Sequence, residues 1–273
     1  LERVRETGTF KLGFREDAPP FSSLGEDGKP RGFTIDLCLR IVSDVQKELG
    51  LAEMKIEYVA LGTEDRFEAV AAGRADLLCG ATTATLSRRE TVSFSIPTFL
   101  TGVSALLRAD ASPFLREVLG GRRPSLAPRY MVHEAFRARK MGARADTTAE
   151  AWLRQSIAEL ATSGEMVTVA SHEDGLKMVY DGEIDAYFAD RAILVGLVSA
   201  SETPEAFLVA ERLFTYEPYA LALARGDEAF RLRVDRTLSR IFRSGEIDSI
   251  FAEHFGSPDP VVRTIFAINS LPE

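Results

Sequence analysis

The stretch TFKLGFREDAPP (residues 9–20) decides the fold of this chain. Apolar side chains alternate with others over residues 9–14, which predicts a β-strand, and the turn-forming residues 17–20 follow directly. Apolar residues then recur at helical spacing over residues 35–49, and Gly50 is a suitable helix end. We therefore expect a strand, a loop at its carboxyl end, and a crossover helix.

Predicted strands and helices continue to alternate along the chain. The strands are expected at 55–59, 75–79, 166–169, 185–188 and 219–224, and the helices at 65–70, 150–160, 174–180, 227–242 and up to Gly256. Such alternation indicates parallel sheets with right-handed crossovers. The segment Pro113 to Met141, rich in Gly, Pro and Arg, is expected to include irregular structure, and the tail Ser257 to Glu273 is expected to pack across the surface.

Length and an internal repeat both favour two lobes. The 273 residues exceed the size of one usual core. The outline Gly73-Arg74-Ala75-Asp76 recurs as Gly182-Glu183-Ile184-Asp185, each time after a predicted helix and before an apolar strand. The repeat predicts one helix-Gly-strand connection in each of two similar α/β lobes.

Composition limits the class of protein. The chain is 45% hydrophobic and 27% charged and contains no run of about 20 apolar residues, as expected for a globular protein. A formal net charge of −8 argues against nucleic acid as a partner, because phosphate binding needs a concentrated basic face. Residues 1–5 lack the pattern of a signal peptide, so either none existed or it was removed.

No metal, cofactor or catalytic nucleophile is expected. Cys38 lies in a predicted helix and Cys79 in a predicted strand, and they are either buried thiols or a disulfide. These two cysteines and the scattered His133, His172 and His254 do not have zinc-like spacing. The chain also lacks a Gly-x-Ser-x-Gly elbow, a Cys-His pairing and a P-loop.

Four motifs together resemble a known family. They are GFREDAPPFS (residues 13–22), GFTIDLC (32–38), DLLCGATTATLSR (76–88) and Phe94-Ser95. In order and spacing they resemble the family 3 extracellular solute-binding proteins, and most of all the glutamate/aspartate-binding members. The resemblance is thinner over residues 109–225.

The resemblance implies an α/β, two-lobed fold of the type II periplasmic-binding-protein kind, with two crossover strands and the ligand between the lobes. Crossings near residues 106–107 and 220–221 would place residues 1–107 and 221–273 in lobe 1. Residues 108–220 would form lobe 2.

A buried amino acid needs partners for its carboxylate and its ammonium group, because either charge is costly to bury alone. The resemblance assigns the α-carboxylate to Arg88, whose guanidinium offers two parallel hydrogen bonds, together with backbone groups of Ala81 and the hydroxyl of Thr83. It assigns the α-ammonium to Asp190, which is also a favourable helix N-cap. Thr148 would add a hydroxyl to the carboxylate.

Specificity is expected from three other positions. Arg15 lies where glutamate/aspartate binders place an arginine for the side-chain carboxylate, and His172 aligns with a histidine of those proteins. The small Ala18 replaces an aromatic residue of binders for cationic or polar amino acids. Asp146 departs from the pattern, because it replaces the Gly of the family's Gly-Thr-Thr and would repel an anion or shift the loop.

These residues predict a monomeric periplasmic binding protein, not an enzyme, that captures an amino acid, most simply glutamate or aspartate, and delivers it to the permease of an ABC transporter. Two alternatives stay open. One is a cyclohexadienyl-dehydratase-like enzyme on the same fold, with Glu173 or Asp174 as the acid. The other is a ligand-sensing domain of a larger receptor.

Overall fold

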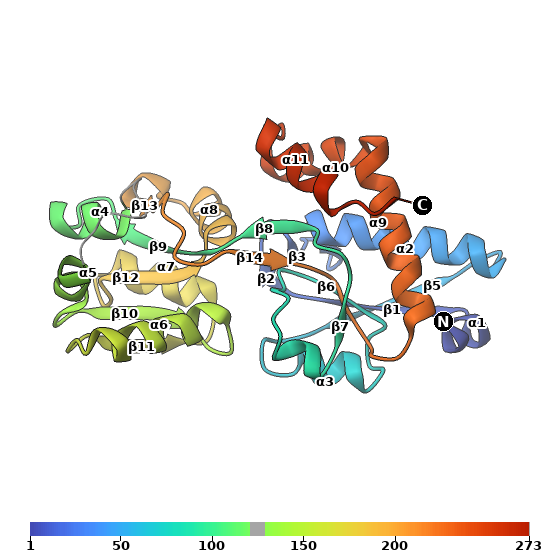
Figure 1. Cartoon of the computed structure of the whole chain (residues 1–273), viewed down its shortest axis with the longest axis horizontal. Coiled ribbons are helices and arrows are strands. Elements are labelled where there is room, and N and C mark those ends of the chain that lie inside the picture. Colours follow the sequence, from blue (N-terminus) through green and yellow to red (C-terminus); the bar gives the residue numbers. More distant parts are fainter. Residues whose placement is uncertain (121–128, 273) are drawn as a thin grey trace. The chain divides into compact units, whose positions relative to one another are not determined.

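The computed structural model describes residues 1–120 and 129–272, which form two compact units (Figure 1). Unit 1 comprises Leu1–Leu100 and Pro218–Glu273, and unit 2 comprises Thr101–Glu217. These divisions lie seven and three residues before the expected lobe boundaries at residues 107 and 220. The first difference arises because the strand Val103–Arg108 (β9) pairs along its length with strands of unit 2.

Unit 1 contains a sheet with the strand order β5-β1-β6-β15-β7. Its strands are β1 (Thr9–Phe14), β5 (Lys55–Ala60), β6 (Leu77–Cys79), β7 (Ser93–Phe94) and β15 (Ala222–Leu223). β1 is parallel to β5 and to β6, and β15 is antiparallel to β6 and β7. The predicted first strand is therefore confirmed, and it lies between the next two parallel strands of the chain.

Unit 2 repeats this arrangement in a sheet with the order β11-β10-β12-β9-β13. Its further strands are β10 (Lys140–Arg144), β11 (Glu165–Val169), β12 (Ala186–Asp190) and β13 (Phe207–Val209). β10 is parallel to β11 and β12, whereas β9 is antiparallel to β12. In both sheets, then, the first parallel strand lies between the second and the third, and an antiparallel strand flanks the third.

The repeated Gly-x-x-Asp outline has a common backbone geometry. Gly73 and Gly182 have φ angles of 71° and 74°, in the left-handed region that glycine adopts at little cost. Asp76 Oδ2 accepts the N–H of Lys11 at 2.7 Å, and Asp185 Oδ2 accepts the N–H of Lys140 at 2.9 Å. Each aspartate thus fixes the start of its strand against the first strand of its own sheet.

The helices mostly follow the predicted pattern. Those of unit 1 are α1 (Glu2–Thr7), α2 (Phe33–Leu49), α3 (Arg66–Ala71), α9 (Glu228–Ser244), α10 (Glu246–Phe255) and α11 (Pro260–Asn269). Those of unit 2 are α4 (Pro113–Gly120), α5 (Arg129–Phe136), α6 (Thr148–Leu160), α7 (His172–Tyr180) and α8 (Arg191–Ala200). Short 3₁₀ turns form at Arg88–Glu90 and Pro204–Ala206.

In three segments the structure contains elements that the sequence did not indicate. The segment expected to be irregular contains α4 and α5, while residues 121–128 lie outside the described residues. The tail includes α11, whose Asp259 side chain accepts the N–H of Val262 as an N-cap. The strand expected over 219–224 is divided between β14 (Glu217–Tyr219), which pairs with β8 (Phe99–Thr101), and β15.

Aromatic packing and a disulfide stabilise unit 1. Phe21, Phe33, Phe99 and Phe255 pack with ring centroids 4.9–6.3 Å apart, joining the first loop to α2 and α10. Cys38 of α2 and Cys79 of β6 form a disulfide with a Cα–Cα distance of 6.3 Å. The first crossover helix is thus linked covalently to the third parallel strand.

Unit 2 has its own aromatic packing. Trp152 of α6 lies 5.4 Å from Phe188 and 4.8 Å from Phe214, measured between ring centroids. Phe188 also packs on Phe136 within a buried cluster that includes Met141 and Leu153. Trp152 is therefore part of the packing of unit 2.

Candidate functional site

The first candidate residues lie at the carboxyl ends of β1 and β6 in unit 1. Phe14 and Cys79 are partners in the register of these strands, so the loops beginning at Arg15 and Gly80 are neighbours. A Cβ atom on Gly80 would lie 3.0 Å from Cγ of Arg15, so the absence of a side chain there leaves room for the arginine. Arg15 is only 4% exposed, and its Nη2 lies 2.7 Å from Oδ1 of Asp17.

Arg88 lies in the same loop region as Thr83. Its Nη1 donates to the carbonyl oxygen of Thr83 at 2.8 Å, and its guanidinium carbon is 5.1 Å from the ring centroid of Phe67. The N–H of Arg88 donates to Oγ1 of Thr85 at 3.2 Å, so Thr85 holds the start of the 3₁₀ turn. Arg88 is half-buried, whereas the adjacent Arg89 is exposed.

The loop that carries Ala81 and Thr83 is held by the returning chain. The carbonyl oxygen of Thr82 accepts the N–H of Ala220 at 3.0 Å, and the N–H of Ala84 donates to Pro218 at 2.9 Å. Thr83 is buried and forms an isolated bridge with Tyr219, while Ala81 is half-buried. The structure therefore brings Arg15, Ala81, Thr83 and Arg88 to one edge of the sheet.

Arg66 is a further residue at this edge that the sequence did not single out. It is buried, donates to the carbonyl oxygen of Thr63, and its guanidinium carbon lies 4.7 Å from the ring centroid of Phe67. Phe67 therefore has two guanidinium groups over its ring, those of Arg66 and Arg88. The only signal in the sequence was an arginine in the first turn of a predicted helix, which is common on exposed helices.

The second group of candidate residues lies at the carboxyl ends of β10, β11 and β12 in unit 2. Arg144 ends β10, His172 begins the helix that follows β11, and Asp190 ends β12. These three strands are parallel neighbours, so their carboxyl ends share one edge. Arg144 is buried and was not predicted, because its strand begins within the segment expected to be irregular.

His172 is buried and oriented by a tyrosine. Its Nδ1 lies 2.8 Å from the hydroxyl oxygen of Tyr187, and Tyr187 is a core residue of β12. Ser171 caps the helix N-terminus, with its side chain accepting the N–H of Asp174 in a capping box. The contact between Nδ1 and Tyr187 thus fixes the orientation of the imidazole ring at the carboxyl end of β11.

Thr148 and Asp190 differ in how the structure uses them. Thr148 Oγ1 donates to Oε2 of Glu217 at 2.7 Å, and Thr215 donates to the other carboxylate oxygen at 2.8 Å. Glu217, a buried acid that the sequence did not single out, thus holds the hydroxyl expected to meet a ligand carboxylate. Asp190 stands at the N-cap position of α8, but its side chain forms no capping hydrogen bond.

The departure at Asp146 has a backbone explanation. Its φ angle is 57°, in the left-handed region where the family's glycine is favoured and where aspartate is among the tolerated residues. Its N–H donates to Oε2 of Glu150 at 2.9 Å. The loop therefore keeps a glycine-like conformation although it carries a carboxylate.

The chain matches the model of the bacterial extracellular solute-binding proteins, family 3, over residues 10–257. It belongs to this family. Among its relatives is the L-glutamate/L-aspartate-binding protein of Pseudomonas aeruginosa, 30% identical over 261 residues, which cover 95% of this chain and 81% of the relative. A glutamate/aspartate import solute-binding protein of Salmonella typhimurium is 24% identical over 95% of this chain and 80% of its own.

Solved structures agree with the fold of this solute-binding protein. The ancestral amino acid-binding protein AncCDT-1, described as a precursor of cyclohexadienyl dehydratase, has a TM-score of 0.74. It is 22% identical, with 93% of this chain and 98% of the other covered, and so supports the fold alone. The predicted two-lobed α/β fold is confirmed. Among the described residues of this solute-binding protein, every helix is too short or too polar to cross a membrane.

Proposed function

We propose that this protein is a periplasmic binding protein that captures glutamate or aspartate and delivers it to the permease of an ABC transporter. The observation that carries the proposal is the edge of unit 1, where the guanidinium groups of Arg15, Arg66 and Arg88 gather around a loop with a buried threonine hydroxyl. Such a concentration of bidentate donors suits a ligand with two carboxylates. The names of the two bacterial relatives support the same ligand class.

Different residues of unit 1 bind the two carboxylates of the ligand. Arg88 and Thr83, with backbone groups at Ala81, bind the α-carboxylate, and Arg15 binds the side-chain carboxylate. Arg66, which shares the ring of Phe67 with Arg88, adds positive charge to this edge. A ligand with two carboxylates can contact both Arg88 and Arg15, whereas a monocarboxylic ligand can contact only one of them through a carboxylate.

Residues of unit 2 complete the set. Asp190, whose side chain does not cap α8, binds the α-ammonium. His172, whose ring is oriented by the contact of Nδ1 with Tyr187, donates to the side-chain carboxylate. Thr148 reaches the α-carboxylate once its hydroxyl leaves Glu217. Ligand binding favours the conformation of the monomer that the permease recognises.

The test is calorimetric titration with glutamate, aspartate, glutamine and arginine after unfolding and refolding to remove copurified ligand. We expect one glutamate or aspartate per chain. Arg88→Ala should weaken binding at least about 100-fold, because it removes the charged group proposed to form two hydrogen bonds with the α-carboxylate. Arg15→Ala should weaken binding of the acidic amino acids more than that of glutamine.

Arg89→Ala is the matched control, since Arg89 is the exposed neighbour of Arg88 and should leave the affinity within about twofold. Tight binding of arginine but not of glutamate or aspartate would contradict the ligand assignment. Turnover of prephenate by the purified protein would show that the fold serves an enzyme here.

A further inference from the structure

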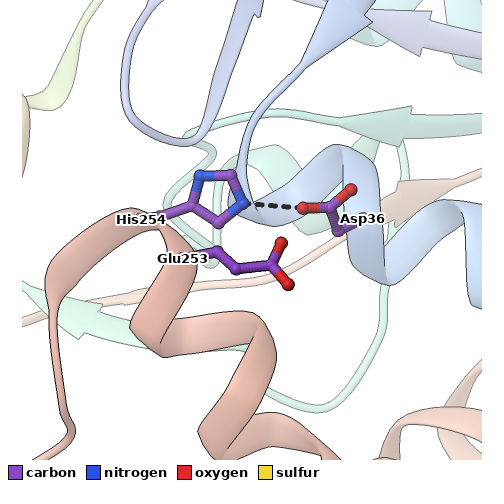
Figure 2. A group of neighbouring side chains, drawn as sticks. All are labelled: Asp36, Glu253 and His254. Carbon is purple, nitrogen blue, oxygen red and sulfur yellow. Dashed lines mark hydrogen bonds and ion pairs between the residues drawn. The ribbon is translucent and has the colours of Figure 1, made fainter.

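A group of three metal-ligating side chains lies in unit 1, away from the candidate residues described above (Figure 2). Asp36 is in the first turn of α2, and Glu253 and His254 are in the last turn of α10. Although 218 residues separate Asp36 from His254, Nε2 of the histidine lies 2.6 Å from Oδ2 of the aspartate. The fold thus assembles a ligand set that spacing along the sequence does not reveal.

The three side chains converge. One ligand atom from each lies within 4.8 Å of the other two. Figure 2 shows the carboxylate of Glu253 beside the contact between His254 and Asp36. Zinc–nitrogen and zinc–oxygen bonds of about 2.0–2.2 Å place the ligands of one ion roughly 3–3.5 Å apart. Small rotations about the side-chain bonds therefore suffice to bring all three atoms onto one ion.

Charge balance sets this group apart from the other acids where α2, α9 and α10 pack together. Asp44 of α2 pairs with Arg240 at 2.9 Å, and Glu246 of α10 pairs with Arg40 and Arg240 at 3.3 and 3.2 Å. These acids are neutralised by arginine.

No arginine or lysine among the described residues pairs with Asp36 or Glu253. Within that part of the chain, the only ion-pair partner of Asp36 is His254, and Glu253 has none. Two carboxylates therefore lie close to one imidazole without an arginine or lysine among the described residues to neutralise them. A helix-to-helix hydrogen bond would explain Asp36 and His254 alone, but it gives no role to Glu253.

The surroundings hold the imidazole in place and leave the site accessible. The rings of Phe33 and Phe255 lie 6.3 and 6.5 Å from the ring of His254, at edge-on angles of 79° and 65°. Phe33 is fully buried, so it is a fixed support. His254 and Asp36 are partly exposed and Glu253 is exposed, which leaves room for water as a further ligand.

We propose that Asp36, Glu253 and His254 form a binding site for a divalent transition-metal ion that joins α2 to α10. One imidazole nitrogen and two carboxylate oxygens suit zinc, cobalt or manganese, whereas calcium prefers oxygen alone and copper(I) prefers sulfur. The ion would neutralise both carboxylates through two metal–oxygen bonds. It also links the amino-terminal part of unit 1 to the helices formed after the chain returns from unit 2.

The experiment uses the full chain, stripped of metal with a chelator and free of amino acids. Titration calorimetry with Zn²⁺ and visible absorption with Co²⁺ should both show one equivalent bound. At about 100 times the dissociation constant, Zn²⁺ should raise the melting temperature by roughly 5 °C.

Three variants decide the outcome. His254→Ala and Glu253→Gln should each weaken Zn²⁺ binding at least about 10-fold and abolish the Co²⁺ absorption bands. Glu253→Gln alters an exposed side chain and leaves the contact between His254 and Asp36 intact, so it tests the site without a risk to folding. Glu246→Gln, on the same helix but paired with arginines, should change the affinity less than about twofold.

The proposal is overturned if the wild-type protein binds no Zn²⁺ or if both variants keep wild-type affinity. It is equally overturned if only His254→Ala loses binding, since the carboxylate of Glu253 would then not be a ligand.

Discussion

Units 1 and 2 share the order and direction of their first strands, and they differ in chain continuity, covalent links and charged side chains. Each sheet has its first parallel strand between the second and third, and each third strand begins with a left-handed glycine and an aspartate that accepts an N–H from the first strand. Only unit 1 has a disulfide, and only unit 1 is built from two separate stretches of chain. The comparison shows that both units use the same Gly-x-x-Asp connection before the third strand. Their stability and binding chemistry depend on residues that the two units do not share.

The edges of the two sheets carry complementary chemistry. The edge of unit 1 gathers the guanidinium groups of Arg15, Arg66 and Arg88, whereas that of unit 2 combines Asp190 and Glu217 with the buried Arg144. Cations suit carboxylates, and acids suit an ammonium group. An arginine thus lies at the carboxyl end of the first parallel strand of each sheet, Arg15 directly after β1 and Arg144 at the end of β10, whereas the third strand of unit 2 ends at the acid Asp190.

Removal of the disulfide should cause the largest change in the relative stability of the two units. Cys38→Ser with Cys79→Ser opens a link between residues 41 positions apart, which should destabilise unit 1 by about 3–4 kcal/mol. Unit 2, which has no cysteine, should keep its stability. Fluorescence of Trp152, the only tryptophan, reports on unit 2, and far-UV circular dichroism reports on both units.

We expect the early part of the dichroism transition to move to lower denaturant concentration while the Trp152 transition stays in place. A Trp152 transition that moves by the same amount would show that the effect is not confined to unit 1.

A smaller difference in stability is expected between variants of the two equivalent aspartates, Asp76 and Asp185. The side chain of Asp76 is 15% exposed and also contacts Arg3, whereas that of Asp185 is 42% exposed and lies 3.8 Å from Arg139. Asp76→Ala should therefore cost about 1.5–3 kcal/mol and Asp185→Ala about 0.5–1.5 kcal/mol, because a buried N–H without an acceptor is more costly. Equal costs in denaturant unfolding would mean that burial does not set the difference.

The smallest effect concerns Asp235 of α9, which lies in the second of the two stretches of chain that form unit 1. Burial raises the pKa of Asp235 in α9 even though its carboxylate accepts the N–H of Ile96. When the pKa of a carboxyl group is higher in the folded state than in the unfolded state, the folded state favours the protonated form. Protonated Asp235 therefore stabilises the fold at low pH, and this stabilisation is lost as the pH rises through the pKa of the folded state.

Asp235→Asn keeps an oxygen for Ile96 and removes the buried charge. It should be about 0.5–1 kcal/mol more stable than the wild type at pH 7, and the two should converge at acid pH. Unfolding curves at several pH values test this, and a variant less stable than the wild type at pH 7 would contradict it.

The sequence predicted the features that depend on local periodicity. The alternation of strands and helices was correct over most of the chain, because each amphipathic element shows its own repeat. Gly73 and Gly182 were recognised since a left-handed connection needs glycine in both units. The roles of Arg88 and Asp190 were assigned from the resemblance to the family and stay predictions, while the order of elements placed Asp190 at the carboxyl end of a strand.

Features that depend on contacts distant in sequence were missed. Arg66 and Arg144 look like ordinary charged residues until packing buries them. Glu217 was missed because its role depends on Thr148, 69 residues earlier, and His254 acquires its partner only when α10 packs on α2. The role of Asp146 needed a φ angle, which periodicity does not provide.

The order in which the chain is synthesised affects the two units differently. Unit 2 is one continuous stretch, and its sheet is complete once Val209 has been made. In unit 1, β15 lies between β6 and β7, so this sheet cannot be completed until Ala222 and Leu223 leave the ribosome. The amino-terminal 100 residues therefore have to wait for the whole of unit 2 to be translated before their own fold can be finished.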